Sequence, residues 1–288
     1  MVEVLVHFVA PALVGVLIGI ASGLLGIGGG TVMVPIFRLA FGMSATMSTA
    51  TSLFAIIPTS ISGAISHVKG KTCIPALGIA AGLGGACLSP VGVWLAQLSP
   101  DWLVMLAAAL IIGYSAINMF KKAFKIPRAG QPAEGADAAA ATPSLTSSGE
   151  PAVSAPTADD SSLSRKQLLQ GAAIGLVAGL ASGYVGVGGG FIMVPLMLSI
   201  IGIPMRKASG TSLIAVMILA IPGVIEQGII GNINYLAGIA IVIGTIPGAV
   251  IGARLVTKVP ERTLRLLFGC FLIVAAVMLV LNEVGIFG

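Results

Sequence analysis

The sequence has few charged residues. Only 9% of its 288 residues are Asp, Glu, Lys or Arg, whereas soluble domains carry about 25%. Aromatic residues make up 5%, and the three cysteines (Cys73, Cys87 and Cys270) stand far apart without a CxxC pair. The low charge excludes an ordinary soluble domain. The cysteine spacing gives no sign of a redox or metal site, so we expect these side chains to pack within apolar segments.

Motifs of catalysis and nucleotide binding are also missing. The sequence contains no HExxH, no GxSxG and no cluster of carboxylates or histidines. No lysine follows the glycine run at Gly30, as the Walker motif would require, and no strand pattern precedes it. We therefore predict that the protein is not an enzyme and uses no metal or cofactor. The net charge of +5 is spread over loops, which gives no reason to expect a nucleic-acid partner.

What the sequence does contain is apolar. Hydrophobic residues make up 57% of it, and its mean hydropathy is +1.07. Apolar segments of about 20 residues recur along the chain, which predicts an all-α polytopic membrane protein. Residues 1–20 resemble a signal peptide, but no Lys or Arg precedes their apolar run and the following sequence returns later in the chain. We therefore expect this first segment to be retained.

The chain repeats itself. Ala21 to Pro35 reads ASGLLGIGGGTVMVP, and Ala181 to Pro195 reads ASGYVGVGGGFIMVP, a shift of 181 − 21 = 160 residues. The same shift continues to the end of each half, and this predicts two halves of about five membrane-embedded helical elements each. We assign residues 1–125 to the first transmembrane repeat, 126–164 to a flexible cytoplasmic linker rich in Pro, Ala and Ser, and 165–288 to the second repeat.

The basic residues predict how the halves are oriented. In the first half Lys69 and Lys71 follow the third element, whereas in the second half Arg206 and Lys207 follow the second element. Equivalent loops therefore carry opposite charge bias, and the positive-inside rule makes the halves an inverted-topology repeat with both termini outside. Arg38 is the exception to this pattern.

The glycine-rich motifs predict broken helices. Glycine weakens a helix, and the apolar piece from Thr31 to Phe41 is too short to cross about 30 Å of hydrocarbon. In inverted-repeat transporters such breaks hold the substrate near the midplane of the membrane. Backbone N–H groups and a helix start near Thr31 suit an anion without a buried lysine or arginine. The GxxxG faces just before the breaks, in contrast, predict close packing against another helix and not anion binding.

The candidate substrate-binding residues are the glycines of the breaks and the hydroxyl residues near them. The hydroxyls in the third element of each half either coordinate the substrate or cap that helix. The full set is Ser22, Gly28, Gly29, Gly30, Thr31, Thr49, Thr51, Ser52, Ser182, Gly188, Gly189, Gly190, Ser209, Thr211 and Ser212. His67 and Glu226 stand at near-equivalent positions. A role in proton coupling is open for both, but solvation at the membrane interface is the interpretation we favour.

At the repeated motif the sequence resembles the sulfite exporter TauE/SafE family. GLLGIGGGTVMVP at 23–35, GYVGVGGGFIMVP at 183–195, ATSL at 50–53 and GTSL at 210–213 carry the resemblance, which covers both halves but not the linker. It implies transport of a small sulfur-containing anion, such as sulfite or an organosulfonate, across the inner membrane.

We therefore predict a secondary transporter, in the export direction, whose partners are a small inorganic or organic sulfur oxyanion and the lipid bilayer. Two alternatives stay open at this point. One is an anion channel, and the other is a non-transporting membrane assembly or sensor protein that uses the linker as its contact.

Overall fold

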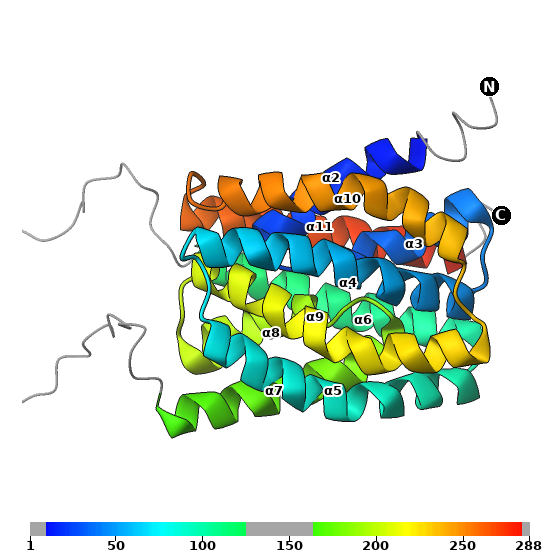
Figure 1. The fold of residues 1–288 in the computed structure, drawn as a ribbon, viewed down its shortest axis with the longest axis horizontal. Coiled ribbons are helices and arrows are strands. Elements are labelled where there is room, and N and C mark those ends of the chain that lie inside the picture. The colour runs from blue at the N-terminus through cyan, green and yellow to red at the C-terminus, as the bar shows by residue number, and fades with distance from the viewer. Residues whose placement is uncertain (1–9, 125–163, 284–288) are drawn as a thin grey trace, which may run out of the picture.

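The protein is a bundle of helices in a computed structural model that describes residues 10–124 and 164–283 (Figure 1). These two ranges contain no strand. Almost all of the linker predicted at 126–164 lies outside the described residues, and so do residues 1–9 and 284–288.

Helical elements of the two halves correspond one to one. The first half consists of α2 (Ala10–Leu25), α3 (Gly30–Phe41), α4 (Ala45–Lys69), α5 (Pro75–Leu98) and α6 (Asp101–Phe124). The second consists of α7 (Arg165–Val185), α8 (Gly190–Leu196), the π-helix η2 (Met197–Ile201), α9 (Met205–Ile230), α10 (Tyr235–Leu255) and α11 (Glu261–Glu283). The helix η2 follows α8 directly, so that together they match α3 across the shift of 160 residues.

Several of these helices are long enough to cross a bilayer. Within the described ranges, seven have the required length and apolar character, namely α4, α5, α6, α7, α9, α10 and α11. The shorter apolar helices are α2, α3 and the α8–η2 stretch. The prediction of a short element after the first break is confirmed, because α3 has 12 residues and is about 18 Å long. The protein is therefore an all-helical, multi-pass membrane protein.

The halves are interlocked rather than side by side. Helix α2 packs mainly against α10 of the other half, and α7 packs in the same way against α5. Gly19 and Gly23 of α2 lie so close to α10 that a Cβ on either would collide with its backbone, and Gly179 and Gly183 of α7 meet α5 in the same way. The predicted GxxxG faces therefore do bring helices close together, and they join one half to the other.

The repeat extends to hydrogen bonds between helices. The backbone N–H of Ala45, the first residue of α4, donates to Asp101 Oδ2 at 3.2 Å. At the equivalent place in the second half, the N–H of Met205 donates to Glu261 Oε1 at 3.3 Å. In both halves, the carboxylate at the start of the fifth element thus satisfies a donor at the start of the third.

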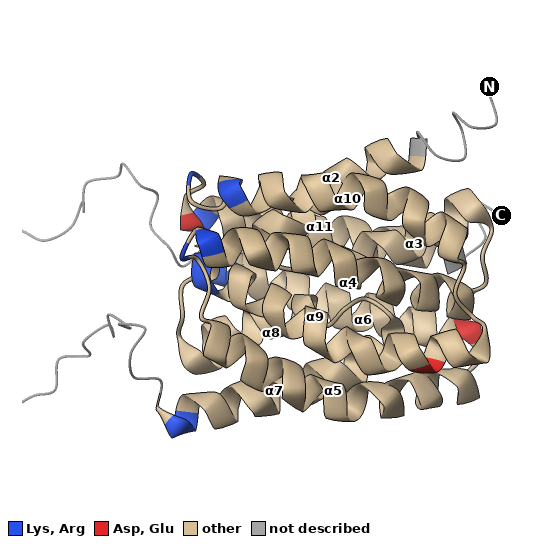
Figure 2. Cartoon of the chain, in the orientation of Figure 1, with Lys and Arg blue, Asp and Glu red and all other residues tan. Residues whose placement is uncertain are grey.

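The long helices α4 and α9 contact each other inside the bundle and run in opposite directions (Figure 1). Figure 2 shows Lys and Arg gathered at one end of the molecule, where α4 ends and α9 begins. Lys71 from the first half lines a cavity of about 480 Å³ there together with Arg206 and Lys207 from the second. Basic segments that are far apart in the sequence thus meet at the same end of the fold.

Candidate functional site

Each half has a break between its first two helices, built on left-handed glycines. Helix α2 ends at Leu25 and α3 begins at Gly30, while α7 ends at Val185 and α8 begins at Gly190. Three glycines in each break have positive φ between 68° and 89°, a conformation that side chains with a Cβ rarely adopt. These glycines are Gly26, Gly28 and Gly29 in the first break and Gly186, Gly188 and Gly189 in the second.

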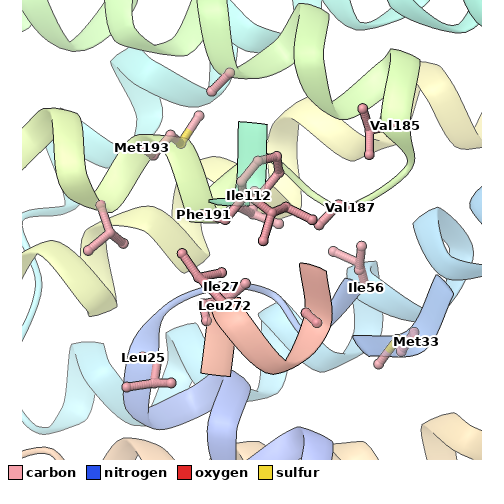
Figure 3. Close-up of a cluster of buried hydrophobic side chains, with 14 of the residues drawn as sticks. Leu25, Ile27, Met33, Ile56, Ile112, Val185, Val187, Phe191, Met193 and Leu272 are labelled. Atoms are coloured by element: carbon pink, nitrogen blue, oxygen red, sulfur yellow. The ribbon is translucent and has the colours of Figure 1, made fainter. Parts of the chain in front are cut away.

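The two breaks touch inside the bundle. A Cβ on Gly30 would lie 2.6 Å from the carbonyl oxygen of Val187, and one on Gly190 would lie 2.5 Å from that of Gly26. Figure 3 shows Ile27 and Val187 pointing from the two breaks into one apolar cluster, which also contains Phe191. The predicted glycine sites are thus brought together, but apolar side chains fill the space between them.

Several polar groups of the breaks are buried without partners. The N–H groups of Gly28, Gly29, Gly188 and Gly189 donate no hydrogen bond to any described residue. The hydroxyls of Ser22 and Ser182 are also fully buried and unpaired. A buried polar group without a partner is rare in proteins, and one explanation is a ligand that binds there at another stage of function.

Each of these serines stands beside the glycine that ends its break. A Cβ on Gly29 would lie 3.6 Å from Cβ of Ser22, and one on Gly189 would lie 3.4 Å from Cβ of Ser182. The two halves therefore repeat the same local group, which consists of a serine in the last turn of the first helix and free glycine N–H groups in the following loop.

The hydroxyl residues of α4 and α9 do not cap their own helices. Ser44 caps α4 by accepting from the N–H of Met47, and Thr51 and Thr211 lie inside α4 and α9. Their hydroxyls instead accept from the other half: Thr51 from the N–H of Asn234 at 3.0 Å and Thr211 from that of Ile74 at 2.9 Å. The capping interpretation is wrong as stated, because these hydroxyls support the starts of α10 and α5.

The other hydroxyls predicted to bind substrate differ in whether they already form hydrogen bonds within the protein. Thr49 and Ser209 donate to backbone carbonyls within their own helices. Ser212 lies within hydrogen-bonding distance of the carbonyl of Gly26, at 2.7 Å, and so supports the first break. Thr31 and Ser52 are buried without a partner. Among the predicted hydroxyls, those of Thr31 and Ser52 therefore join Ser22 and Ser182 as free donors.

Sequence reasoning missed three further buried, unpaired hydroxyls, those of Ser48, Ser60 and Ser89. Ser60 is close to the first break, since a Cβ on Gly28 would lie 3.4 Å from its Oγ. A signal for them was present, because the equivalent residues in the second half are Ala208, Ala220 and Ala249. Positions where the repeat replaces serine with alanine would have pointed to polar groups peculiar to the first half.

His67 and Glu226, the ionisable residues of the long helices α4 and α9, were expected to be solvated at the membrane interface. His67 is fully buried rather than interfacial, and its ring nitrogens lie 2.8 Å from the carbonyl of Gly23 and 2.7 Å from Thr72 Oγ1. Its equivalent is the buried Gln227, which bonds to Asn232 as His67 does to Thr72. Interfacial solvation is therefore wrong for His67. Glu226 is half-buried and stands one position away from the true equivalent.

The described ranges offer no cluster of side chains suited to a metal ion, and their cysteines stand apart. They contain no group of three or more His, Cys, Asp or Glu residues that could hold a metal ion. Cys73 is buried, whereas Cys87 and Cys270 are exposed on the outer surface of the bundle. Cys87 and Cys270 lie in the apolar helices α5 and α11, as expected, but on their exposed faces.

Known proteins resemble the chain over nearly its whole length. The model of the family described as sulfite exporter TauE/SafE matches residues 11–279. A Bacillus subtilis protein named "Probable membrane transporter protein YunE" is 26% identical over 289 residues, covering 97% of this chain and 99% of that protein. A Haemophilus influenzae protein named "Probable membrane transporter protein" is 28% identical over 94% of this chain and 97% of its own. No solved structure matches the chain.

Proposed function

We propose that this chain, which belongs to the sulfite exporter TauE/SafE family of membrane transporters, is a secondary transporter of a small sulfur-containing anion. Sulfite is the substrate that the family description names, and the motif resemblance adds organosulfonates as candidates. We assign the protein to the inner membrane, with export as the direction of transport. The anion binds where the two glycine-rich breaks meet.

The observation that carries this proposal is the set of unpaired donors in the breaks. Buried N–H groups of Gly28, Gly29, Gly188 and Gly189 lack acceptors among the described residues. An oxyanion offers several acceptor oxygens and would satisfy them. Helix α3, with 12 residues, begins at the first break and adds the positive end of its dipole. Neither break needs a buried lysine or arginine for this purpose.

Transport by alternating access fits the arrangement of the halves. We assign them as an inverted-topology repeat, with both termini outside and the linker in the cytoplasm. The opposite directions of α4 and α9 and the gathering of basic residues at one end support this assignment. Ile27 and Val187 close the space between the breaks, so the halves must move apart to admit the anion and then close behind it.

The test is counterflow of labelled sulfite into proteoliposomes preloaded with sulfite. Replacing both serines beside the breaks (Ser22→Ala with Ser182→Ala) removes two donors to a charged ligand, each worth about 1.5–3 kcal/mol. We expect sulfite exchange to fall more than about tenfold and the thermal stabilisation of the purified protein by sulfite to disappear. Ser62→Ala, whose hydroxyl bonds to Ile246 O away from the breaks, should leave both unchanged.

Two results would contradict the proposal. Unaltered exchange and unaltered stabilisation in the double variant would remove the breaks from the binding site. Large single-channel currents without counterflow would make the protein a channel instead of a carrier.

A further inference from the structure

A groove runs along the outside of the bundle between α6, α7 and the α8–η2 stretch. It has a volume of about 710 Å³ and is lined mostly by apolar side chains. Two of these side chains, Tyr114 and Val177, are 69% and 56% exposed. Since α6 and α7 are candidate membrane spans, this opening faces the space that lipid occupies.

One end of the groove is polar and holds Lys122, Asn118 and Ser199. Lys122, in the last turn of α6, donates from Nζ to the carbonyl oxygen of Pro195 at 3.1 Å and also to Ser199 Oγ. Asn118 lies one turn earlier on α6 and also lines the groove. A lysine ammonium has three donors, so one N–H remains after these two contacts. Figure 2 shows that Lys and Arg gather at the end of the molecule where α6 finishes.

The length of the groove matches one leaflet of a bilayer. Along α6 its lining runs from Ile111 to Lys122, a separation of 122 − 111 = 11 residues, or about 16 Å of helix. The hydrocarbon core of a bilayer is about 30 Å thick, so a single acyl chain occupies about half of it. A chain lying in the groove would therefore place its headgroup beside Lys122.

The polar residues of the groove are not repeated at the equivalent positions of the other half. Ser115, Asn118 and Ser199 line the groove, whereas the equivalent positions in the other half hold Ala275, Met278 and Leu39. The equivalent of Lys122 is the uncharged Asn282. The stretch that holds Ser199 is also the π-helix η2, while the matching part of α3 is an ordinary α-helix. Local π-helices often mark functional positions.

We propose that this groove binds one anionic phospholipid, with an acyl chain along α6 and α7 and the phosphate on Lys122. The lipid comes from the leaflet that faces the basic end of the molecule. It would hold α6 of the first half against α7 and η2 of the second, beside the second break. This site is separate from the proposed anion site and does not depend on it.

Native mass spectrometry of the full-length protein, taken from nanodiscs of mixed phosphatidylglycerol and phosphatidylcholine, tests the proposal. We expect wild type to retain one phosphatidylglycerol in preference to phosphatidylcholine. Lys122→Gln should lower that retention about fivefold, the effect of one lysine at a membrane surface. Lys122→Arg should preserve it. Lys121→Gln removes the same charge from an exposed neighbour outside the groove and should change nothing.

A second variant tests the groove without altering a charge. Asn118→Leu copies the apolar character of the other half and fills part of the polar end, so we expect retention to fall while the thermal stability of the protein is kept. Equal retention of both lipids, or equal losses in Lys121→Gln and Lys122→Gln, would overturn the proposal. So would a protein dimer that dissociates in Asn118→Leu, since a second copy of the chain would then occupy the groove.

Discussion

At the scale of single residues, the most informative side chains are Thr51 and Thr211. Both lie inside a long central helix, and each hydroxyl accepts from the backbone at the start of a helix in the other half. Thr211 also donates to the carbonyl of Lys207 at 2.7 Å, so its one hydroxyl proton is already used within the protein. These threonines join the halves, and they are weaker candidates for substrate binding than the unpaired Ser22 and Ser182.

Replacing them should therefore lower stability. Thr51→Val and Thr211→Val keep the shape of the side chain but leave a helix-start N–H of α10 or α5 without its acceptor. Loss of such an acceptor costs about 0.5–2 kcal/mol, which should appear as a lower melting temperature of the detergent-purified protein. Thr257→Val, at an exposed threonine that bonds only within its own turn, should melt like wild type. Melting of all three variants at the wild-type temperature would contradict this role.

At the scale of helices, the sequence predicted the position and length of each helix better than which helices pack against each other. The lengths of the apolar segments, the short piece after the break and the close-packing glycine faces are local properties, and the structure confirms them. The pairing of α2 with α10 and of α7 with α5 was not predictable, because a GxxxG face specifies a close approach but not which helix approaches. The same limit explains Thr51, whose partner lies 183 residues away in the chain.

The glycine face of α7 gives a sharp test of this packing. Gly179→Leu would force a side chain into the backbone of α5 at Gly85, and overpacking of this kind costs about 1–3 kcal/mol or more. We expect a lower melting temperature and less folded protein in the membrane fraction. Gly113→Ala, in α6 with nothing near its Cβ position, should differ from wild type by no more than about 1 kcal/mol. Equal behaviour of the two variants would mean that α5 and α7 are not in close contact.

For the whole molecule, the interlocked halves explain how the two glycine-rich breaks come together as one candidate site. Neither break is complete in its own half: Gly26 is held by Ser212 from α9, and a side chain on Gly186 would collide with Thr49 of α4. The sequence predicted a shared site from the repeat and the charged loops. It did not predict that the side chains of Ile27 and Val187 fill the space between the breaks. Isoleucine and valine within a glycine-rich run look like ordinary membrane-facing residues.

If the halves are inverted, Lys69 and Arg206 should lie on the same side of the membrane. Lys71 and Arg206 line one cavity although they follow different elements of their halves, and the positive-inside rule predicts that this end lies in the cytoplasm. In a variant with Cys73, Cys87 and Cys270 replaced by alanine, Lys69→Cys and Arg206→Cys should both resist an impermeant maleimide added outside intact cells. Gln97→Cys, an exposed residue near the end of α5, should react from outside. All three should react once the cells are opened. If the Lys69→Cys and Arg206→Cys variants reacted from opposite sides, the halves would be parallel, and alternating movement of an inverted pair would no longer describe this protein.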